Sequence, residues 1–366
     1  RFVVENKDRY LEGRYFFDRW DLALQAQGLI KQQREFYRQK EDYRERLGAF
    51  EWELPEKTHS DYFVGDLASW WIEQKPKTEP LFLQIGFPGP HPPYDPIPEY
   101  AKKYIDIDIP LPEVSQEELE AQPSALKKLN IHNCEVDHDS IYWTLKPSKE
   151  QLKRMRAYYM ANVEMIDKKI GEIIDALDRK GYLENTVIIF TSDHGDCLGD
   201  HGHTQKWTMF DEVTRVPMIV WAPKLFKGGR KVDCLCQNFD IAPVIMELAG
   251  INTPDYWEAE SLMPILKGES SDGRDYVFCE QARDQARLFG IIEQITMIRS
   301  KEWKLVHYLG TDDEGELYDL KNDPGEHNNL WKDSRYTAHK QELINELMKW
   351  LMRSNIRTSS WAVTWR

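Results

Sequence analysis

The sequence lacks long apolar runs, a disulfide framework and an excess of positive charge. No run of about 18 apolar residues occurs in the 366 residues, so no membrane-spanning helix is expected. The five cysteines are odd in number and match no disulfide spacing, which favours a reducing compartment such as the cytoplasm. Acidic residues outnumber lysine and arginine by 62 to 48, and the net charge of −14 argues against a nucleic-acid partner.

The chain also lacks a methionine and a signal peptide at its start. A cut or incomplete chain is therefore expected, and the N-terminus leaves the compartment undefined. The composition is globular, with 41% apolar residues, and the length suits one large or two smaller domains. A polar Gly/Ser stretch at residues 267–274 predicts a boundary between a domain at residues 1–270 and a smaller one at residues 271–366.

Helix and strand patterns alternate in the first domain. Apolar residues recur every three or four positions from Gln151 to Lys180, which predicts a long helix that ends before Gly181. The apolar run at residues 186–190 follows at once and predicts a strand. A long helix that leads into an apolar strand is typical of an α/β fold, in which helices cover the faces of a sheet.

Further elements are weaker in pattern. Strands are predicted at residues 81–86 and 216–221, and helices at residues 61–74 and 240–248, with Asp240 as the helix cap. Residues 106–148 look irregular. The second domain shows four short strand-like runs and then an amphipathic helix, which together predict a small α+β domain; they lie at residues 276–280, 295–299, 303–307, 316–320 and 337–352.

The stretch TSDHGDCLGDHGHTQK at residues 191–206 gathers charged and metal-binding side chains at the end of a predicted strand. Functional groups collect beyond the carboxyl ends of strands in α/β sheets. Asp193 and His194 can together ligate one divalent cation, and Gly195 lets the backbone turn away. Lys206 can return to the same place as a positive charge for an anion. A cation and a lysine suit a substrate that carries sulfate or phosphate.

Other histidines are candidates for the same site. The loop FPGPHPPY holds His91 in one place, because each proline fixes its own φ. His201 and His203 lie in the loop that carries Lys206. Each of them either contacts substrate or makes a hydrogen bond that shapes the loop, and Cys197 is expected to be a packed thiol.

Several segments then resemble one family, in that family's order. The sequence is similar to the sulfatase family of the alkaline phosphatase superfamily, which shows a TSDHG or TSDNG strand end, a following lysine and an R-V-P strand. The likeness extends over most of residues 60–350, through PGPHPPYDPIPEY, YYMANVEMIDKKIGEIIDALDRKGYLENT, NFDIAPVIMELAGI and the C-terminal ELYDLKNDPGEHNNL, which matches the pattern ELYDL-x-x-DP-x-E-x-x-NL.

The resemblance implies a fold and a reaction. The fold is α/β, with a mixed, largely parallel central sheet between helices, as in alkaline phosphatase, and a C-terminal α+β domain with a short antiparallel sheet. The reaction is metal-dependent hydrolysis of sulfate esters by a formylglycine nucleophile. Asp193 and His194 match the family's late pair of metal ligands, and Lys206 and His91 match its catalytic lysine and histidine. Calcium is the expected ion, with manganese or zinc as alternatives because His194 makes the site softer.

Three family motifs are absent from the 366 residues: C/S-x-P-S/A-R, which carries the nucleophile, an early Asp-Asp pair of metal ligands and a G-K-x-H segment. All three belong before Arg1, so we expect an N-terminal portion to be missing. The chain alone should then be inactive, because it supplies half of an active site.

Three functions stay open. The first is a sulfatase that acts on a small-molecule or glycan sulfate ester. The second keeps the scaffold but hydrolyses phosphonate monoesters or phosphodiesters. The third is a non-catalytic relative that binds an anion or a glycan through Lys206. A homo-oligomer is compatible with all three.

Overall fold

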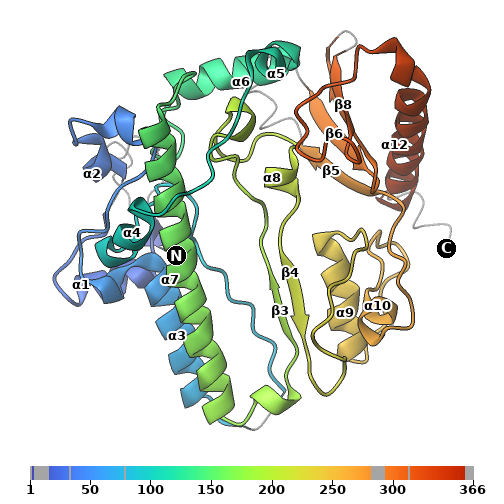
Figure 1. Ribbon diagram of the computed structural model, residues 1–366. Helices are drawn as coiled ribbons and strands as arrows, with labels where there is room; N and C mark the ends of the chain where they lie inside the picture. Colours follow the sequence, from blue (N-terminus) through green and yellow to red (C-terminus); the bar gives the residue numbers. More distant parts are fainter. Residues whose placement is uncertain are drawn as a thin grey trace. The chain divides into compact units, whose positions relative to one another are not determined.

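The computed structural model describes residues 2–3, 16–32, 34–77, 80–281, 293–311 and 314–358 (Figure 1). They form two compact units. Unit 1 comprises residues 1–111 and 133–184, and unit 2 comprises residues 112–132 and 185–366. The boundary predicted at residue 270 lies inside unit 2, where Arg274 beyond it binds Asp240 before it, at 2.5 Å. None of the described helices combines the length and apolarity that crossing a membrane requires.

The described elements range from strands of two residues to a helix of 31 residues. The helices are α1 (Arg19–Gln25), α2 (Arg34–Arg38), α3 (Ser60–Gln74), α4 (Pro98–Ile105), α5 (Gln116–Ala121), α6 (Ser124–Glu135), α7 (Lys149–Arg179), α8 (Asp211–Thr214), α9 (Ile241–Leu248), α10 (Met263–Lys267) and α12 (Thr337–Thr358). The strands are β1 (Phe2–Val3), β2 (Phe16–Phe17), β3 (Ile188–Thr191), β4 (Met218–Trp221), β5 (Val277–Gln281), β6 (Gln294–Arg299), β7 (Trp303–Leu309) and β8 (Gly315–Asp319).

Unit 1 is built on α7, the long helix that the apolar period predicts. Ser148 and Gln151 form a capping box at its start, and Gly181 follows its end at a φ of 70°. Helix α3 lies against α7 (Figure 1). The two helices approach closely at Gly65, where a Cβ would lie 2.7 Å from Cβ of Lys169. This close packing explains why a glycine interrupts the predicted helix at residues 61–74.

The strand predicted at residues 81–86 is wrong. The segment is irregular, and Phe82 and Leu83 are 74% and 38% exposed. A strand needs a neighbour that shares its backbone hydrogen bonds, and none of the described residues forms a ladder with this segment. The prediction of irregular structure at residues 106–148 is also wrong, because α5 and α6 form there.

In unit 2, β3 pairs with β4 and the register joins Ile189 to Val220. The ladder is antiparallel, and the sheets among the described residues contain no parallel ladder, which departs from the expected largely parallel sheet. One face of the pair packs with α9 and α10 through Met218 and Val220. Asp240 precedes α9, as predicted, but its side chain makes no cap; it is buried and binds Arg274.

The four C-terminal strands form the predicted antiparallel sheet, in the order β5-β6-β7-β8. Both faces are buried. One face packs with α12 through Ile298, Leu305 and Leu317. The other face packs with α6 and with Trp207, Met209 and Phe210, which follow the charged loop at residues 191–206. The sheet therefore supports the segment on which the candidate site depends.

Candidate active site

The predicted metal ligands follow directly after β3. Asn238 clamps this strand end, since its amide donates to the Ser192 carbonyl at 2.7 Å and its oxygen accepts from Thr191 at 2.9 Å. The Ser192 hydroxyl donates to the carbonyl of His194 at 2.8 Å. These contacts hold the backbone on both sides of Asp193, whose carboxylate accepts from the His194 N–H at 2.9 Å and extends toward solvent.

Asp193 and His194 are brought together. The Asp193 side chain is 87% exposed, and one of its oxygens lies 3.7 Å from Nε2 of His194. Nδ1 of His194 is 2.8 Å from the carbonyl oxygen of Gly195, which can only accept, so Nδ1 carries the proton. This tautomer leaves a lone pair on Nε2, next to the carboxylate. Histidine ligands of metals are commonly oriented in this way.

Gly195 sits where no side chain fits. A Cβ at this position would lie 1.8 Å from the backbone oxygen of Glu212. The close approach lets the Gly195 N–H donate to the carbonyl of Val213 at 2.8 Å. The sequence predicts that Gly195 lets the chain turn; the structure adds that the turn packs directly on α8.

The loop between Gly195 and Lys206 is strained and pinned. Leu198, His201 and Gln205 adopt left-handed backbone conformations, with φ of 46°, 56° and 63°. Such conformations cost on the order of 1 kcal/mol each for residues other than glycine. The Asp196 carboxylate accepts from the backbone N–H of Leu198 and of Gln205, at 3.0 and 2.9 Å. One carboxylate therefore holds both ends of the loop.

Lys206 is half-buried at the end of this loop. Within the part of the chain that the structure describes, it makes no hydrogen bond or ion pair with a side chain or a carbonyl. Its neighbours Gln205 and Trp207 are 2% and 7% exposed. A lysine that is held on a buried loop and has no partner among the described residues is suited to bind an anion from solution. Cys197 in the same loop is fully buried, and burial raises its pKa, as expected for a packed thiol.

His91 lies in unit 1, after α3 and before α4. Its Nδ1 is 2.7 Å from the carbonyl oxygen of Pro92, so Nδ1 donates, and its Nε2 lies 3.6 Å from the Asp139 carboxylate. The side chain is 36% exposed. With Nδ1 as the donor to Pro92, Nε2 is the nitrogen left to exchange a proton, which is what general acid–base catalysis needs.

His203 has a structural contact. It is fully buried, and its Nε2 lies 3.1 Å from the amide oxygen of Gln122, to which it donates. Burial and the positive charge of His201 lower its pKa to about 3, so the ring is neutral. Gln122 also donates to the carbonyl of His201 at 2.8 Å. The pair ties the end of α5 to the loop, which is the loop-shaping role that the sequence leaves open.

His201 lies between two carboxylates. Nδ1 is 2.7 Å from Glu118 and Nε2 is 3.2 Å from Glu212, while the ring stacks on Phe210 with centroids 3.7 Å apart. Burial opposes a charge on the ring, but the hydrogen bonds and charges of the two glutamates raise its pKa to about 9. Glu118 also contacts Nδ1 of His327, at 3.0 Å.

The far end of the loop is anchored by buried charges. Lys304 on β7 has no exposed surface and donates to Asp211 at 2.5 Å and to the carbonyl of Met209 at 3.0 Å, and it pairs with Glu326. Arg299 on β6 binds the same aspartate at 3.0 Å. The C-terminal sheet thus fixes α8, against which Gly195 packs.

Neither these buried charges nor Glu118 is predicted from the sequence. Glu118 is separated from His201 by 83 positions and from His327 by 209, so no local spacing could indicate the contact. The expectation of irregular structure at residues 106–148 also hid α5, although Ser115 caps it by accepting from the Glu118 N–H at 3.0 Å. A serine before an acidic turn is the signal that could have found the helix.

A divalent cation fits the Asp193–His194 pair as two members of a larger ligand set. The donor chemistry suits a metal, since one ligand is an exposed carboxylate and the other an imidazole with its lone pair beside it. Calcium takes six to eight ligands and zinc about four, so further ligands must come from elsewhere.

Comparisons with known proteins identify the family of the chain. A family model described as "Sulfatase" matches residues 15–251, and one described as "N-sulphoglucosamine sulphohydrolase, C-terminal" matches residues 199–353. The N-acetylglucosamine-6-O-sulfatase of Bacteroides thetaiotaomicron is 33% identical over 195 residues, which is 52% of this chain and 34% of that protein. The arylsulfatase of Clostridium perfringens is 30% identical over 82% of this chain and 59% of its own length.

A solved structure matches more of the fold. The phosphonate monoester hydrolase of Agrobacterium radiobacter has a TM-score of 0.76 and 25% identity, over 92% of this chain and 69% of that one. This likeness confirms the alkaline phosphatase-like α/β class. The chain spans only 34% and 59% of the two curated relatives above, so each of them has a large part to which this chain has no counterpart.

Proposed function

Because the chain belongs to the sulfatase family, we propose that the protein hydrolyses sulfate esters through the loop that follows β3. One observation carries the proposal. Asp193 and His194 present a carboxylate and an imidazole lone pair side by side, and the same pinned loop ends in Lys206, which has no partner among the described residues. A cation site and a positive charge on one loop suit an ester whose acid group carries negative charge.

Asp193 and His194 would hold the divalent ion, calcium in the first instance and manganese or zinc as alternatives. Such an ion, when bound, draws negative charge from the ester oxygens as bonds form and break. Lys206 would bind a non-bridging or leaving oxygen through its ammonium group. As the resemblance implies, His91 would give the leaving oxygen its proton from Nε2.

The nucleophile would be a formylglycine from a segment outside the 366 residues, because none of their cysteines or serines has the x-P-S/A-R context. The 366-residue chain alone should therefore not turn over substrate. The first step is to read the parent gene for C/S-x-P-S/A-R, and a gene without any nucleophile motif would favour an anion-binding or glycan-binding protein.

The substrate class has two candidates. The likeness to an N-acetylglucosamine-6-O-sulfatase supports a sulfated sugar or another small sulfate ester. The likeness to a phosphonate monoester hydrolase supports phosphonate monoesters as the second candidate. We favour sulfate esters, because both family models and the two curated relatives carry sulfatase names.

The test compares kcat/KM for 4-nitrophenyl sulfate and a 4-nitrophenyl phosphonate ester on the complete protein. Lys206→Met should lower kcat/KM by roughly 10²–10³-fold, the usual loss when one charge-stabilising donor is removed. Lys227→Met, which removes an exposed lysine elsewhere in unit 2, is the matched control and should keep full activity. Equal activity of the Lys206 and Lys227 variants would refute the role of Lys206, and a preference for the phosphonate would replace the substrate class.

A further inference from the structure

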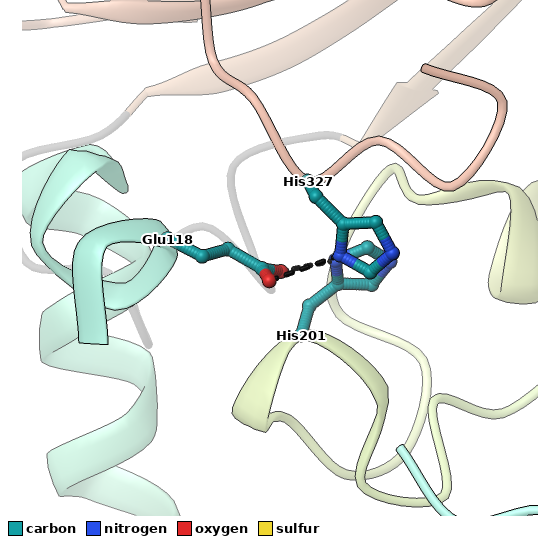
Figure 2. Close-up of side chains that lie close together, drawn as sticks. All are labelled: Glu118, His201 and His327. Carbon is teal, nitrogen blue, oxygen red and sulfur yellow. Dashed lines mark hydrogen bonds and ion pairs between the residues drawn. The ribbon is translucent and has the colours of Figure 1, made fainter. Parts of the chain in front are cut away.

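Glu118, His201 and His327 form a second cluster of metal-binding groups. Figure 2 shows the Glu118 carboxylate pointing toward the two imidazole rings. Its oxygens lie 2.7 Å from Nδ1 of His201 and 3.0 Å from Nδ1 of His327. One ligand atom from each residue lies within 4.8 Å of the other two. The three come from α5, from the charged loop and from the loop after β8, so the tertiary fold converges them.

The surroundings of His201 already match those of a metal ligand. Its Nε2 lies 3.2 Å from the Glu212 carboxylate, to which it donates. A carboxylate on the outer nitrogen orients the ring and raises the basicity of the inner nitrogen, as in carboxylate–histidine–zinc arrangements. The stack on Phe210 fixes the plane of the ring. Nδ1 is thereby directed at Glu118 and His327.

We propose that Glu118, His201 and His327 bind a divalent transition-metal ion, with zinc as the first candidate, at a site separate from Asp193 and His194. Two nitrogens and one carboxylate oxygen are ligands that zinc accepts, whereas calcium prefers oxygen alone. Three protein ligands leave the fourth position of a tetrahedral ion to water. The ion would take the lone pair of Nδ1 of His201 in place of the proton that this nitrogen shares with Glu118.

The cluster is buried on one side, which makes it rigid, and exposed on the other, which lets an ion enter from solvent. Glu118 and His201 are 7% and 2% exposed, while the His327 side chain is 51% exposed, so one side opens to solvent. A neighbouring combination of His201, Glu212 and Glu326 is a weaker candidate, because Glu326 is already bound to Lys304 and to the backbone of Asp211.

The ion would act as a clamp. It would join α5 and the loop after β8 to the loop that ends in Lys206, three segments that are otherwise held by hydrogen bonds. In the pattern ELYDL-x-x-DP-x-E-x-x-NL, residue 327 falls on an unspecified position, so the clamp would be a property of this chain rather than of the pattern.

The test is a zinc titration of the chelator-treated full chain, in competition with a chromophoric zinc chelator. Wild type should bind one more equivalent of zinc than His327→Gln. His339→Gln, which removes an exposed histidine outside the cluster, should bind as wild type does. Glu212→Gln should keep the stoichiometry and weaken the affinity by about 10–100-fold, as expected for an outer carboxylate. The Asp193→Asn background removes the other candidate site from the count.

Cobalt gives an independent readout that does not depend on activity. Co²⁺ added to the Asp193→Asn chain should develop the visible absorption of a four-coordinate ion, and His327→Gln should abolish it. Equal zinc stoichiometry and affinity in wild type and His327→Gln would overturn the proposal and leave a hydrogen-bonded network. Unchanged circular dichroism of His327→Gln shows that the variant is folded, which its exposure predicts.

Discussion

The two sheets of unit 2 treat their apolar residues differently. The four-stranded sheet β5-β6-β7-β8 is covered on both faces, and Ile298, Leu305 and Val306 have no exposed surface. Among the residues that the structure describes, the pair β3–β4 packs one face on α9 and α10. On its other face, Ile219 and Trp221 remain 59% and 38% exposed.

The two sheets therefore have different roles: one supports the charged loop, and the other carries the candidate active site. A two-stranded ladder is marginal by itself and depends on what packs against it. The four-stranded sheet has its own core and, through Lys304 and Arg299, holds the end of the loop that β3 begins. The candidate active site therefore lies on the less complete sheet and takes its rigidity from the more complete one.

The largest effect should come from breaking the buried charges that link the sheet to the loop. Lys304→Met leaves Glu326 buried without its cation and removes one of the two cations that bind Asp211, so we expect a loss of about 3–5 kcal/mol in the free energy of unfolding. Urea denaturation measures it. Lys321→Met is the control, because Lys321 pairs with Glu302 on the surface and should cost less than about 1 kcal/mol. Similar losses in both variants would mean that the buried cluster gives no support.

A matched pair of truncations tests the two faces directly. Leu305→Ala removes a fully buried side chain from the four-stranded sheet and should cost about 2–5 kcal/mol. Ile219→Ala removes a side chain from the open face of β4 and should cost less than about 1 kcal/mol. A loss at Ile219 as large as that at Leu305 would show that this face is covered in solution.

Substitution in the turn after β3 should destabilise the protein, although truncation on the open face of β4 should not. Gly195→Ala forces a Cβ onto the Glu212 carbonyl. We expect the free energy of unfolding to fall by about 1–3 kcal/mol and metal binding at Asp193 and His194 to weaken. Gly171→Ala is the control, since nothing lies within 4 Å of a Cβ there and helix α7 should gain about 0.5–1 kcal/mol. Thermal unfolding distinguishes the two, and a stabilised Gly195→Ala protein would contradict the packing.

The smallest effect should be a pH-dependent difference in the free energy of unfolding between wild type and Glu316→Gln. Burial raises the pKa of Glu316 above its usual 4.5, although Tyr308 and Tyr318 donate hydrogen bonds to it. A raised carboxyl pKa contributes stability below pH 4.5 that is lost as pH rises through the folded-state value. Glu316→Gln lacks this loss, so its free energy of unfolding relative to wild type should improve as pH rises above 4.5. A difference that does not change with pH would exclude the raised pKa.

The C-terminal strands are predictable from the sequence pattern. The strands predicted at residues 295–299 and 303–307 match β6 and β7 within two residues, because sequential antiparallel strands carry both their pattern and their partner in a short stretch. The run at residues 81–86 has an equally good pattern but no partner among the described residues, and it is not a strand. Pattern alone therefore indicates strand propensity, and pairing decides the outcome.

The candidate site likewise contains residues that the sequence predicts and residues that it does not. Asp193, His194 and Gly195 are predictable because they are neighbours in the chain, directly after a recognisable strand. Glu118 and Lys304 are not, because each reaches the loop from a distant segment. Long-range contacts of this kind leave no periodic or local signal.

The sequence by itself determined the α/β class, the long helix α7, the C-terminal antiparallel strands and the family to which the chain belongs, because each rests on local periodicity or on contiguous motifs. Only the tertiary structure decided that β3 pairs with β4, that His203 is neutral and buried, and that His201 lies between two glutamates. Those outcomes depend on burial and on charges brought together from separate segments, and the free energy of such contacts exists only once the chain has folded.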